Sequence, residues 1–242
     1  WPEMVNNIDV SEQGITAFLK RIDQTEHLFY HSIGTVGGGN HFVEVGITPD
    51  GNYAFTAHCG SRNLGQKVWK YWKMEADKLM DTSKGYLTGD AMKGYLTDMV
   101  VSQAYAEYNH KVIDRLVLEA ITEASGKTLK IVEQIYTTHN YIDFSMKMLR
   151  KGAVAAPEGR KLVIPFNMRD GLIICHGKGN EDWNQSAPHG AGRLLSRADA
   201  KELIDMEEYK KSMEGIYSTS VGKGTIDESP MAYKNPKEIL QL

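Results

Sequence analysis

Four histidines lie beside glycine-rich or small polar turns, where a side chain can face a ligand. His41 follows the stretch GTVGGGN, His58 opens HCGSRNLG, His139 lies in TTHNY and His189 opens HGAGR. Neutral imidazoles on rigid supports are good ligands for transition metals, so His41 and His58 could bind one metal together with a distant third ligand. No His-x-His or Cys-x-x-Cys spacing supports this. Separate, hydrogen-bonded histidines at loop ends are therefore the simpler interpretation of the spacing alone.

Two glycine clusters, 37–39 and 190–192, are typical of loops that turn successive N–H groups toward an anion. Glycine also serves where a tight turn needs a positive φ, and for a single loop this is the simpler explanation. Neither cluster is a P-loop or a dinucleotide fingerprint. Arg193 and Arg197 are expected one helical turn apart on one face, where they could clamp a phosphate or line a solvated helix face.

Two further residues are ambiguous. Cys59, beside His58, could ligate a metal, although a small buried residue is the preferred interpretation. His176 follows an apolar run and precedes the loop GKGN, and no role can be assigned to it.

The elements that must position these residues follow from apolar periodicity and turn signals. Helices are expected over residues 11–28, 64–80, about 98–124 and the later part of 189–209, strands over 160–165 and 172–175, a hairpin over 41–58 and a loop over 81–96. The run 129–136 is strand-like, although a helix is also possible there. Ser196 and Asp199 have capping-box spacing. The sequence predicts an α+β fold, with residues 1–242 forming a single domain of mixed β-sheets and surrounding helices.

Composition excludes only unusual classes. The 242 residues are 41% hydrophobic and 24% charged with 2 Cys, which excludes a disordered tail, a collagenous repeat and a disulfide-stapled miniprotein. A formal net charge of −3 argues against nucleic-acid binding by bulk charge but permits a local basic site. With no membrane-spanning run and no secretory signal, no membrane partner is expected, and the cytoplasm is the expected location.

Five sequence blocks, in order, carry a resemblance. They are GTVGGGNHFVEVG (34–46), HCGSRNLG (58–65), THNY (138–141), GKGNEDWNQSAPHGAGRLLSR (177–197) and DESPMAYK (227–234). Together they closely resemble the RtcB family of RNA-splicing ligases, over about residues 30–237. The resemblance implies an enzyme that joins an RNA 2′,3′-cyclic phosphate or 3′-phosphate end to a 5′-hydroxyl end, using GTP and a two-metal Mn²⁺ site.

The resemblance also implies residue roles. His189 would be the catalytic nucleophile that takes GMP from GTP, and His41, His58 and His139 would be metal ligands. The residues matching guanylate contacts are Asn40, Glu44, Asn167, Gly190, Ala191, Gly192 and Tyr233. Arg193 and Arg197 would contact RNA or phosphate.

Three departures from the family pattern limit these roles. An N-terminal Asp-x-Gly-Cys-Gly segment with further metal ligands and a lysine near the family's C-terminus are both missing, so we expect a core truncated at both ends. The stretch 165–171 replaces the family's Pro-Gly-Ser-Met-Gly, so serine contacts to the nucleotide are not expected there. The alternatives are a fragment that binds RNA ends or metal without ligating them, and a metal-dependent phosphoesterase acting on cyclic-phosphate ends.

Overall fold

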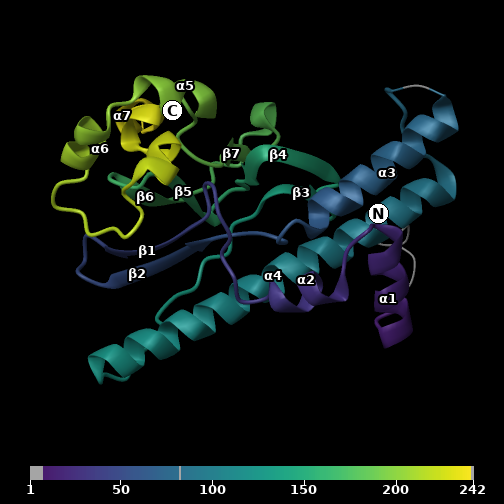
Figure 1. The fold of residues 1–242 in the computed structure, drawn as a ribbon, viewed down its shortest axis with the longest axis horizontal. Helices are drawn as coiled ribbons and strands as arrows, with labels where there is room; N and C mark the ends of the chain where they lie inside the picture. Colours follow the sequence, from purple (N-terminus) through teal and green to yellow (C-terminus); the bar gives the residue numbers. More distant parts are fainter. Residues whose placement is uncertain (1–7, 82, 241–242) are drawn as a thin grey trace. The chain divides into compact units, whose positions relative to one another are not determined.

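The computed structural model describes residues 8–81 and 83–240, which form helices and small β-sheets (Figure 1). The predicted α+β class is therefore confirmed. Contacts group the described residues into two compact units: unit 1 within Trp1–Lys130 and Ile142–Met148, and unit 2 within Ile131–Tyr141 and Leu149–Leu242. The assignment of a single domain stays a prediction.

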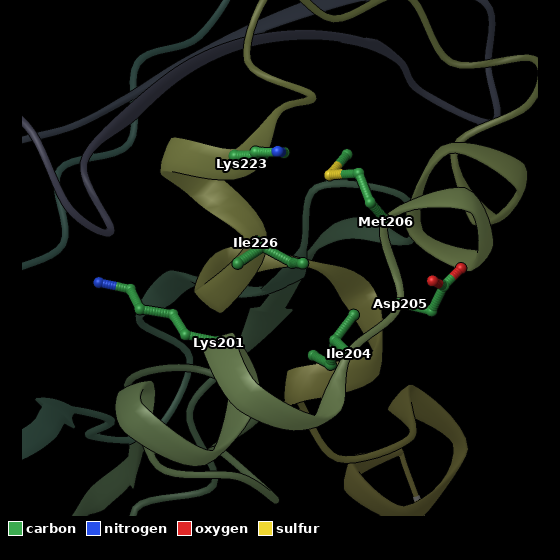
Figure 2. A pocket seen from close by; sticks show the side chains of 6 residues that line it. All are labelled: Lys201, Ile204, Asp205, Met206, Lys223 and Ile226. Atoms are coloured by element: carbon green, nitrogen blue, oxygen red, sulfur yellow. The ribbon is translucent and has the colours of Figure 1, made fainter.

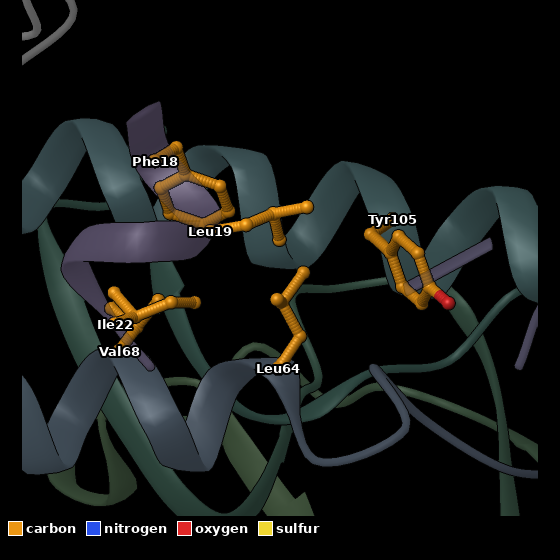
Figure 3. Close-up of a cluster of buried hydrophobic side chains, with 6 residues drawn as sticks. All are labelled: Phe18, Leu19, Ile22, Leu64, Val68 and Tyr105. Atoms are coloured by element: carbon orange, nitrogen blue, oxygen red, sulfur yellow. The ribbon is translucent and has the colours of Figure 1, made fainter. Parts of the chain in front are cut away.

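The described residues of unit 1 form four helices and a hairpin. The elements are α1 (Glu12–Arg21), α2 (Glu26–His31), β1 (Phe42–Ile47), β2 (Tyr53–His58), α3 (Leu64–Met80) and α4 (Gly89–Ser125). Helices α3 and α4 pack side by side, and β1 pairs antiparallel with β2, as the sequence predicts for 41–58 (Figure 1). The core of the unit is made by α1, α3 and α4 (Figure 3). Its buried side chains are Phe18, Leu19, Ile22, Leu64, Val68 and Tyr105.

Unit 2 is built on short strands followed by short helices. Its elements are β5 (Lys161–Asn167), β6 (Gly171–His176), η2 (Glu181–Trp183), β7 (Ser186–Pro188), α5 (Arg197–Leu203), α6 (Met206–Ser212), η3 (Lys223–Glu228), η4 (Pro230–Ala232) and α7 (Pro236–Ile239), with most of β4 (Met148–Ala155) and the first part of β3 (His139–Asp143). The sheets have the orders β3-β4-β7 and β5-β6, and the pairs β4–β7 and β5–β6 are antiparallel. Two apolar clusters hold the unit together, one on β4 and β5 and one centred on Tyr209.

Side-chain caps explain why two predicted helices are divided. The expected helix 11–28 is α1 and α2, because Thr25 accepts a hydrogen bond from the Leu28 N–H and starts a second helix. The helical part of 189–209 is α5 and α6, because Asp205 accepts from the N–H groups of Glu207 and Glu208. Ser196 caps α5 by accepting from the Asp199 N–H, so the predicted cap is present.

The structure differs from the sequence prediction in two other segments. Helix α4 begins at Gly89, inside the expected loop 81–96. Gly94 lies within the first turns of α4. A Cβ at this position would come 2.5 Å from the Trp72 ring, so packing requires glycine there. Residues 129–136 form neither strand nor helix, and several of their apolar side chains, including Val132, are exposed. Among the described residues, no helix has both the length and the apolar composition required to cross a bilayer.

Candidate functional site

The β1–β2 hairpin brings His41 and His58 together in unit 1. His58 ends β2 opposite Phe42, the residue after His41, and the two imidazole centroids are 5.7 Å apart. The antiparallel register produces this proximity, because the first residue of one strand pairs with the last residue of the other. A second pair of neighbouring histidines, His139 and His189, lies in unit 2. The predicted metal-binding roles stay predictions, because no group of three possible metal ligands occurs among residues 8–81 and 83–240.

The environment of His41 suits a neutral imidazole. Its Nδ1 lies 2.9 Å from the Val36 carbonyl oxygen, and because a carbonyl only accepts, Nδ1 carries the proton and Nε2 keeps the lone pair. Burial lowers the pKa of His41, and the positive charge of Arg62 acts in the same direction against the opposing Val36 hydrogen bond. A neutral imidazole oriented through its other nitrogen is the form that binds a metal ion.

Asn109 of α4 holds both loops that carry these histidines. Its Oδ1 accepts from the Gly34 N–H at 2.7 Å, and its Nδ2 donates to the carbonyl oxygens of Thr35 and Gly60, each at 3.2 Å. The side chain is fully buried. One amide therefore ties the chain before His41 and the chain after His58 to the same helix position.

Sequence analysis missed Arg62, which lies against the first glycine cluster. Its guanidinium fills the space where a side chain at residue 37 would lie, since a Cβ there would be 1.9 Å from Nη1. Gly37 also has a φ of +99°, so only glycine suits the position. Arg62 Nε donates to the Thr35 hydroxyl at 3.0 Å. The signal was present in the sequence, because HCGSR places an arginine four residues after His58.

Two predicted guanylate contacts also lie near His41. Asn40 is exposed in the turn before β1, and Glu44 is half-buried on the face of the hairpin opposite to the exposed side chains of Val43 and Val45. Burial raises the pKa of the Glu44 carboxyl. Their nucleotide-binding roles stay predictions.

Cys59 is a packing residue, as the preferred interpretation of the sequence has it. The side chain is buried, Asn109 Nδ2 donates to its sulfur at 3.5 Å, and burial raises the pKa of the thiol to about 11. We expect Cys59 to resist alkylation by iodoacetamide at pH 8 in the native chain, because burial blocks access and the higher pKa lowers the thiolate population about a hundredfold. Peptide mapping by mass spectrometry compares the labelling rate of Cys59 with that of the less buried Cys175. Equal labelling rates of the two thiols in the folded chain would contradict this assignment.

In unit 2, His189 lies beside His139 with the ring centroids 4.8 Å apart. Strand β7 pairs Pro188 with Ala153, and this register places the next residue, His189, alongside Gly152. The His189 Nδ1 lies 2.7 Å from the Gly152 carbonyl oxygen, so Nδ1 carries a proton and the neutral ring has its lone pair on Nε2. Asn140 accepts from the Gly152 N–H at 2.7 Å, so the THNY block both supplies His139 and fixes the backbone that orients His189.

In the loop 190–192, one N–H group that an anion nest would use is already bonded within the protein. The Ala191 N–H donates to the Pro165 carbonyl oxygen at 3.1 Å and Ala191 is buried, so this N–H is used inside the protein. The loop also does not lead directly into a helix, because α5 begins only at Arg197. Gly192 has a φ of +77° and its carbonyl oxygen accepts from the Lys234 N–H. Contacts of Gly190, Ala191 and Gly192 with a nucleotide stay predictions.

Asn167 and His176 lie at the two ends of the β5–β6 hairpin. Asn167 organises the turn, because its Oδ1 accepts from the N–H groups of Arg169 and Asp170 and its Nδ2 donates to the Asp170 carboxylate. His176 is exposed at the end of β6, opposite Lys161. The structure gives Asn167 a role in the turn, and its predicted nucleotide contact stays a prediction.

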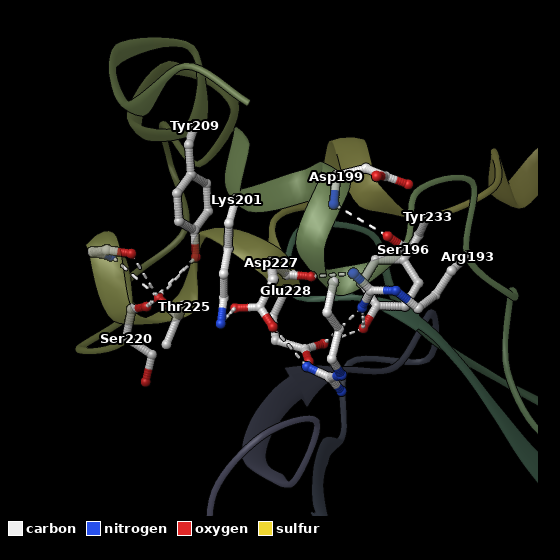
Figure 4. A network of polar contacts seen from close by, with 12 residues as sticks. Arg193, Ser196, Asp199, Lys201, Tyr209, Ser220, Thr225, Asp227, Glu228 and Tyr233 are labelled. Carbon is white, nitrogen blue, oxygen red and sulfur yellow. Dashed lines mark hydrogen bonds and ion pairs between the residues drawn. The ribbon is translucent and has the colours of Figure 1, made fainter. Parts of the chain in front are cut away.

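A polar network joins Arg193, Glu228 and Tyr233 (Figure 4). Arg197 belongs to the same network through Asp227 and Glu228. The expectation that the two arginines lie one turn apart on a helix was wrong, because Arg193 precedes α5 and forms a β-bridge with Tyr233. The Arg193 guanidinium lies 5.0 Å from the Tyr233 ring centroid and 3.6 Å from the Glu228 carboxylate. Arg197 pairs with Asp227 at 2.8 Å and also with Glu228.

Glu228 is the second residue that sequence analysis missed. Its carboxylate contacts Arg193, Arg197 and the hydroxyl of Tyr233, three predicted site residues. Burial and the hydrogen bond to Glu228 raise the pKa of Tyr233, so the phenol stays protonated and donates. The residue lies within the block DESPMAYK, so its position in a motif was the available signal.

Comparisons with known proteins agree with this arrangement of motifs. A family model described as tRNA-splicing ligase RtcB matches residues 6–242. The RNA-splicing ligase RtcB of Escherichia coli (strain K12) is 30% identical over 227 residues, covering 85% of this chain and 55% of the relative. The tRNA-splicing ligase RtcB of Aeropyrum pernix is 27% identical over 305 residues, covering 100% of this chain and 62% of the relative. The chain thus spans little more than half the length of the curated relatives it matches.

Proposed function

The chain belongs to the RtcB family, and from this membership we propose that it catalyses RNA ligation. The substrates would be an RNA with a 2′,3′-cyclic phosphate or 3′-phosphate end and an RNA with a 5′-hydroxyl end. GTP would supply the activating nucleotide. The observation that carries the proposal is family membership, and the orientation of His189 supports it, because Nδ1 is held by the Gly152 carbonyl oxygen and the neutral ring then has its lone pair on Nε2.

The first step is nucleophilic attack by His189 on GTP. Nε2 forms a bond to the α-phosphorus, the bond from that phosphorus to the bridging oxygen breaks, and pyrophosphate leaves with the electron pair. The Gly152 carbonyl oxygen holds the Nδ1 proton throughout and stabilises the positive charge that the ring gains. A 2′,3′-cyclic phosphate end would first be opened by water to a 3′-phosphate. An oxygen of the 3′-phosphate then bonds to the guanylate phosphorus as its bond to His189 breaks, and the 5′-hydroxyl oxygen of the second RNA loses its proton and displaces GMP.

The donor chemistry of the histidines fits a divalent transition metal, and Mn²⁺ is the ion that the family resemblance implies. His41, whose Nδ1 is occupied by the Val36 carbonyl oxygen, has Nε2 available as a ligand, and with His58 and His139 it would hold the metal ions. Bound metal supplies neutralisation of phosphate charge during the attack. The chain's own contribution is the neutral state of His41, which burial favours.

The polar network of unit 2 supports a role in binding the RNA phosphate. Arg193 and Arg197 present their guanidinium groups together because Glu228 contacts both. A dianionic phosphate would compete with Glu228 for the same N–H donors. Guanylate contact by Tyr233, Asn40 and Glu44 belongs to this proposal, as does the expected cytoplasmic location.

Labelling with α-labelled GTP and Mn²⁺ tests the proposal. We expect a covalent band that withstands denaturation in alkali and is lost in acid, as a phosphoramidate requires. Incubation with the two RNA ends should then give one longer product, whereas a phosphoesterase would leave two strands and a protein that only binds RNA ends would leave the substrates unchanged. Absence of both the covalent band and the ligated product would overturn the proposal.

A further inference from the structure

A cavity in unit 2 is not used by the proposed chemistry. It has a volume of about 350 Å³ and is lined by Lys201, Ile204, Asp205, Met206, Lys223 and Ile226, from α5, α6, η3 and the turn between α5 and α6 (Figure 2). Its size is at the lower end of the range of ligand pockets, about 300–1,000 Å³. It is large enough for part of a ligand of nucleotide size.

The charge of the cavity is positive where it faces solvent. Lys201 and Lys223 are both exposed, and no carboxylate among the described residues of unit 2 pairs with Lys223. Lys201 lies 3.9 Å from Asp227, a long contact, and Asp227 is already bound by Arg197 at 2.8 Å. The remaining acid, Asp205, directs its carboxylate to the N–H groups that begin α6 and away from Ile226 (Figure 2).

The floor of the cavity is apolar. Ile226 is buried, Ile204 and Met206 are half-buried, and all three pack in the cluster around Tyr209. In Figure 2, Ile204 and Ile226 lie next to each other, and the side chain of Lys201 extends away from them. A ligand that fits must therefore carry negative charge at one part and a flat or apolar group at another, and methionine adapts well to aromatic surfaces.

The cavity continues from the predicted phosphate contacts. Lys201 lies four residues after Arg197 on α5, which places both on one helix face, and both side chains reach Asp227. Ile226 precedes Asp227 in η3, so the apolar floor adjoins the polar network. Arg197 and Lys201 thus lie next to each other beside Asp227, and Lys201 also lines the cavity.

We propose that this cavity binds one nucleotide of a single-stranded RNA, with a backbone phosphate at Lys223 and the base against Ile204, Met206 and Ile226. The proposal rests on the proposed function, since it names where the strand runs beyond Arg193 and Arg197. Ammonium groups bind backbone phosphates without reading sequence. The apolar side chains can pack against the face of a base, and they offer no hydrogen bond that would distinguish one base from another. The site should therefore add affinity for RNA without base preference.

Fluorescence anisotropy with a labelled oligouridylate tests the cavity. Lys223→Gln is expected to weaken binding about 3- to 10-fold and to reduce the slope of log affinity against log salt by about 1, as loss of one phosphate contact predicts. The matched control is Lys210→Gln on α6, which removes the same charge from an exposed lysine paired with Glu207 and outside the cavity. The control should bind as the unaltered chain does.

Three outcomes would overturn the cavity proposal. They are equal affinity of the Lys223 variant and the unaltered chain, equal losses in both lysine variants, and equal binding of an abasic oligomer of the same length and charge. Covalent labelling by GTP is measured in parallel, and it should be unchanged in Lys223→Gln because RNA takes no part in that step. Failure of labelling in the unaltered chain overturns the proposed function, whereas normal labelling with unaltered RNA binding in the variant overturns the cavity alone.

Discussion

Replacing His189 by alanine is expected to remove covalent labelling by α-labelled GTP completely. The reason is chemical, because Nε2 is the atom that would bond to phosphorus and alanine offers no nucleophile in its place. Loss of a nucleophile lowers rates by on the order of 10³-fold or more, which takes the band below detection. The measurement is the intensity of the alkali-stable band at equal protein concentration, with circular dichroism confirming that the variant is folded.

His176→Ala is the matched control for this experiment. His176 also lies in unit 2 at the end of a strand, but it is exposed and pairs across β5–β6 with Lys161. The His176→Ala variant should be labelled as strongly as the unaltered chain. A band that persists in His189→Ala, or one that depends equally on His176, would contradict the assignment of the nucleophile.

The hairpin and the β5–β6 pair could be predicted from sequence because their apolar runs are bounded by clear turn signals. The proximity of His41 to His58 then follows from the antiparallel register alone. Divided helices were harder to foresee. Thr25 and Asp205 are ordinary polar residues by composition, and only their hydrogen bonds to the following N–H groups show that each starts a new helix.

The contacts that hold the site could not be predicted, because they join residues distant in sequence. Asn109 lies 75 residues from Gly34, and nothing in its own helix marks it as different from other polar positions. Glu228 similarly meets Arg193 and Arg197 across more than 30 residues. Motif resemblance identified the residues expected to perform chemistry, whereas the residues that position them came only from the three-dimensional structure.

Asn109→Ala is expected to cause the largest loss of stability among single changes near the histidines. The substitution leaves the Gly34 N–H and the carbonyl oxygens of Thr35 and Gly60 without their partner at a fully buried amide. Unpaired buried polar groups cost about 1–3 kcal/mol each, and with partial access of water we expect a total decrease of about 2–4 kcal/mol in the free energy of unfolding. Urea denaturation monitored by circular dichroism measures this decrease in the free energy of unfolding.

The same substitution should also weaken binding of a divalent metal by unit 1, because both loops that carry His41 and His58 lose their attachment to α4. Co²⁺ titration followed by visible absorption measures this effect separately from stability, at temperatures where the variant remains folded. The control is Glu107→Ala, two residues away on α4, which removes an exposed ion pair with Lys111 and should change the unfolding free energy by less than about 0.5 kcal/mol. If both variants unfold at the same urea concentration and bind Co²⁺ alike, Asn109 does not position the histidine loops. A lower urea midpoint and weaker Co²⁺ binding in Asn109→Ala alone would show that one buried amide sets the geometry of both loops.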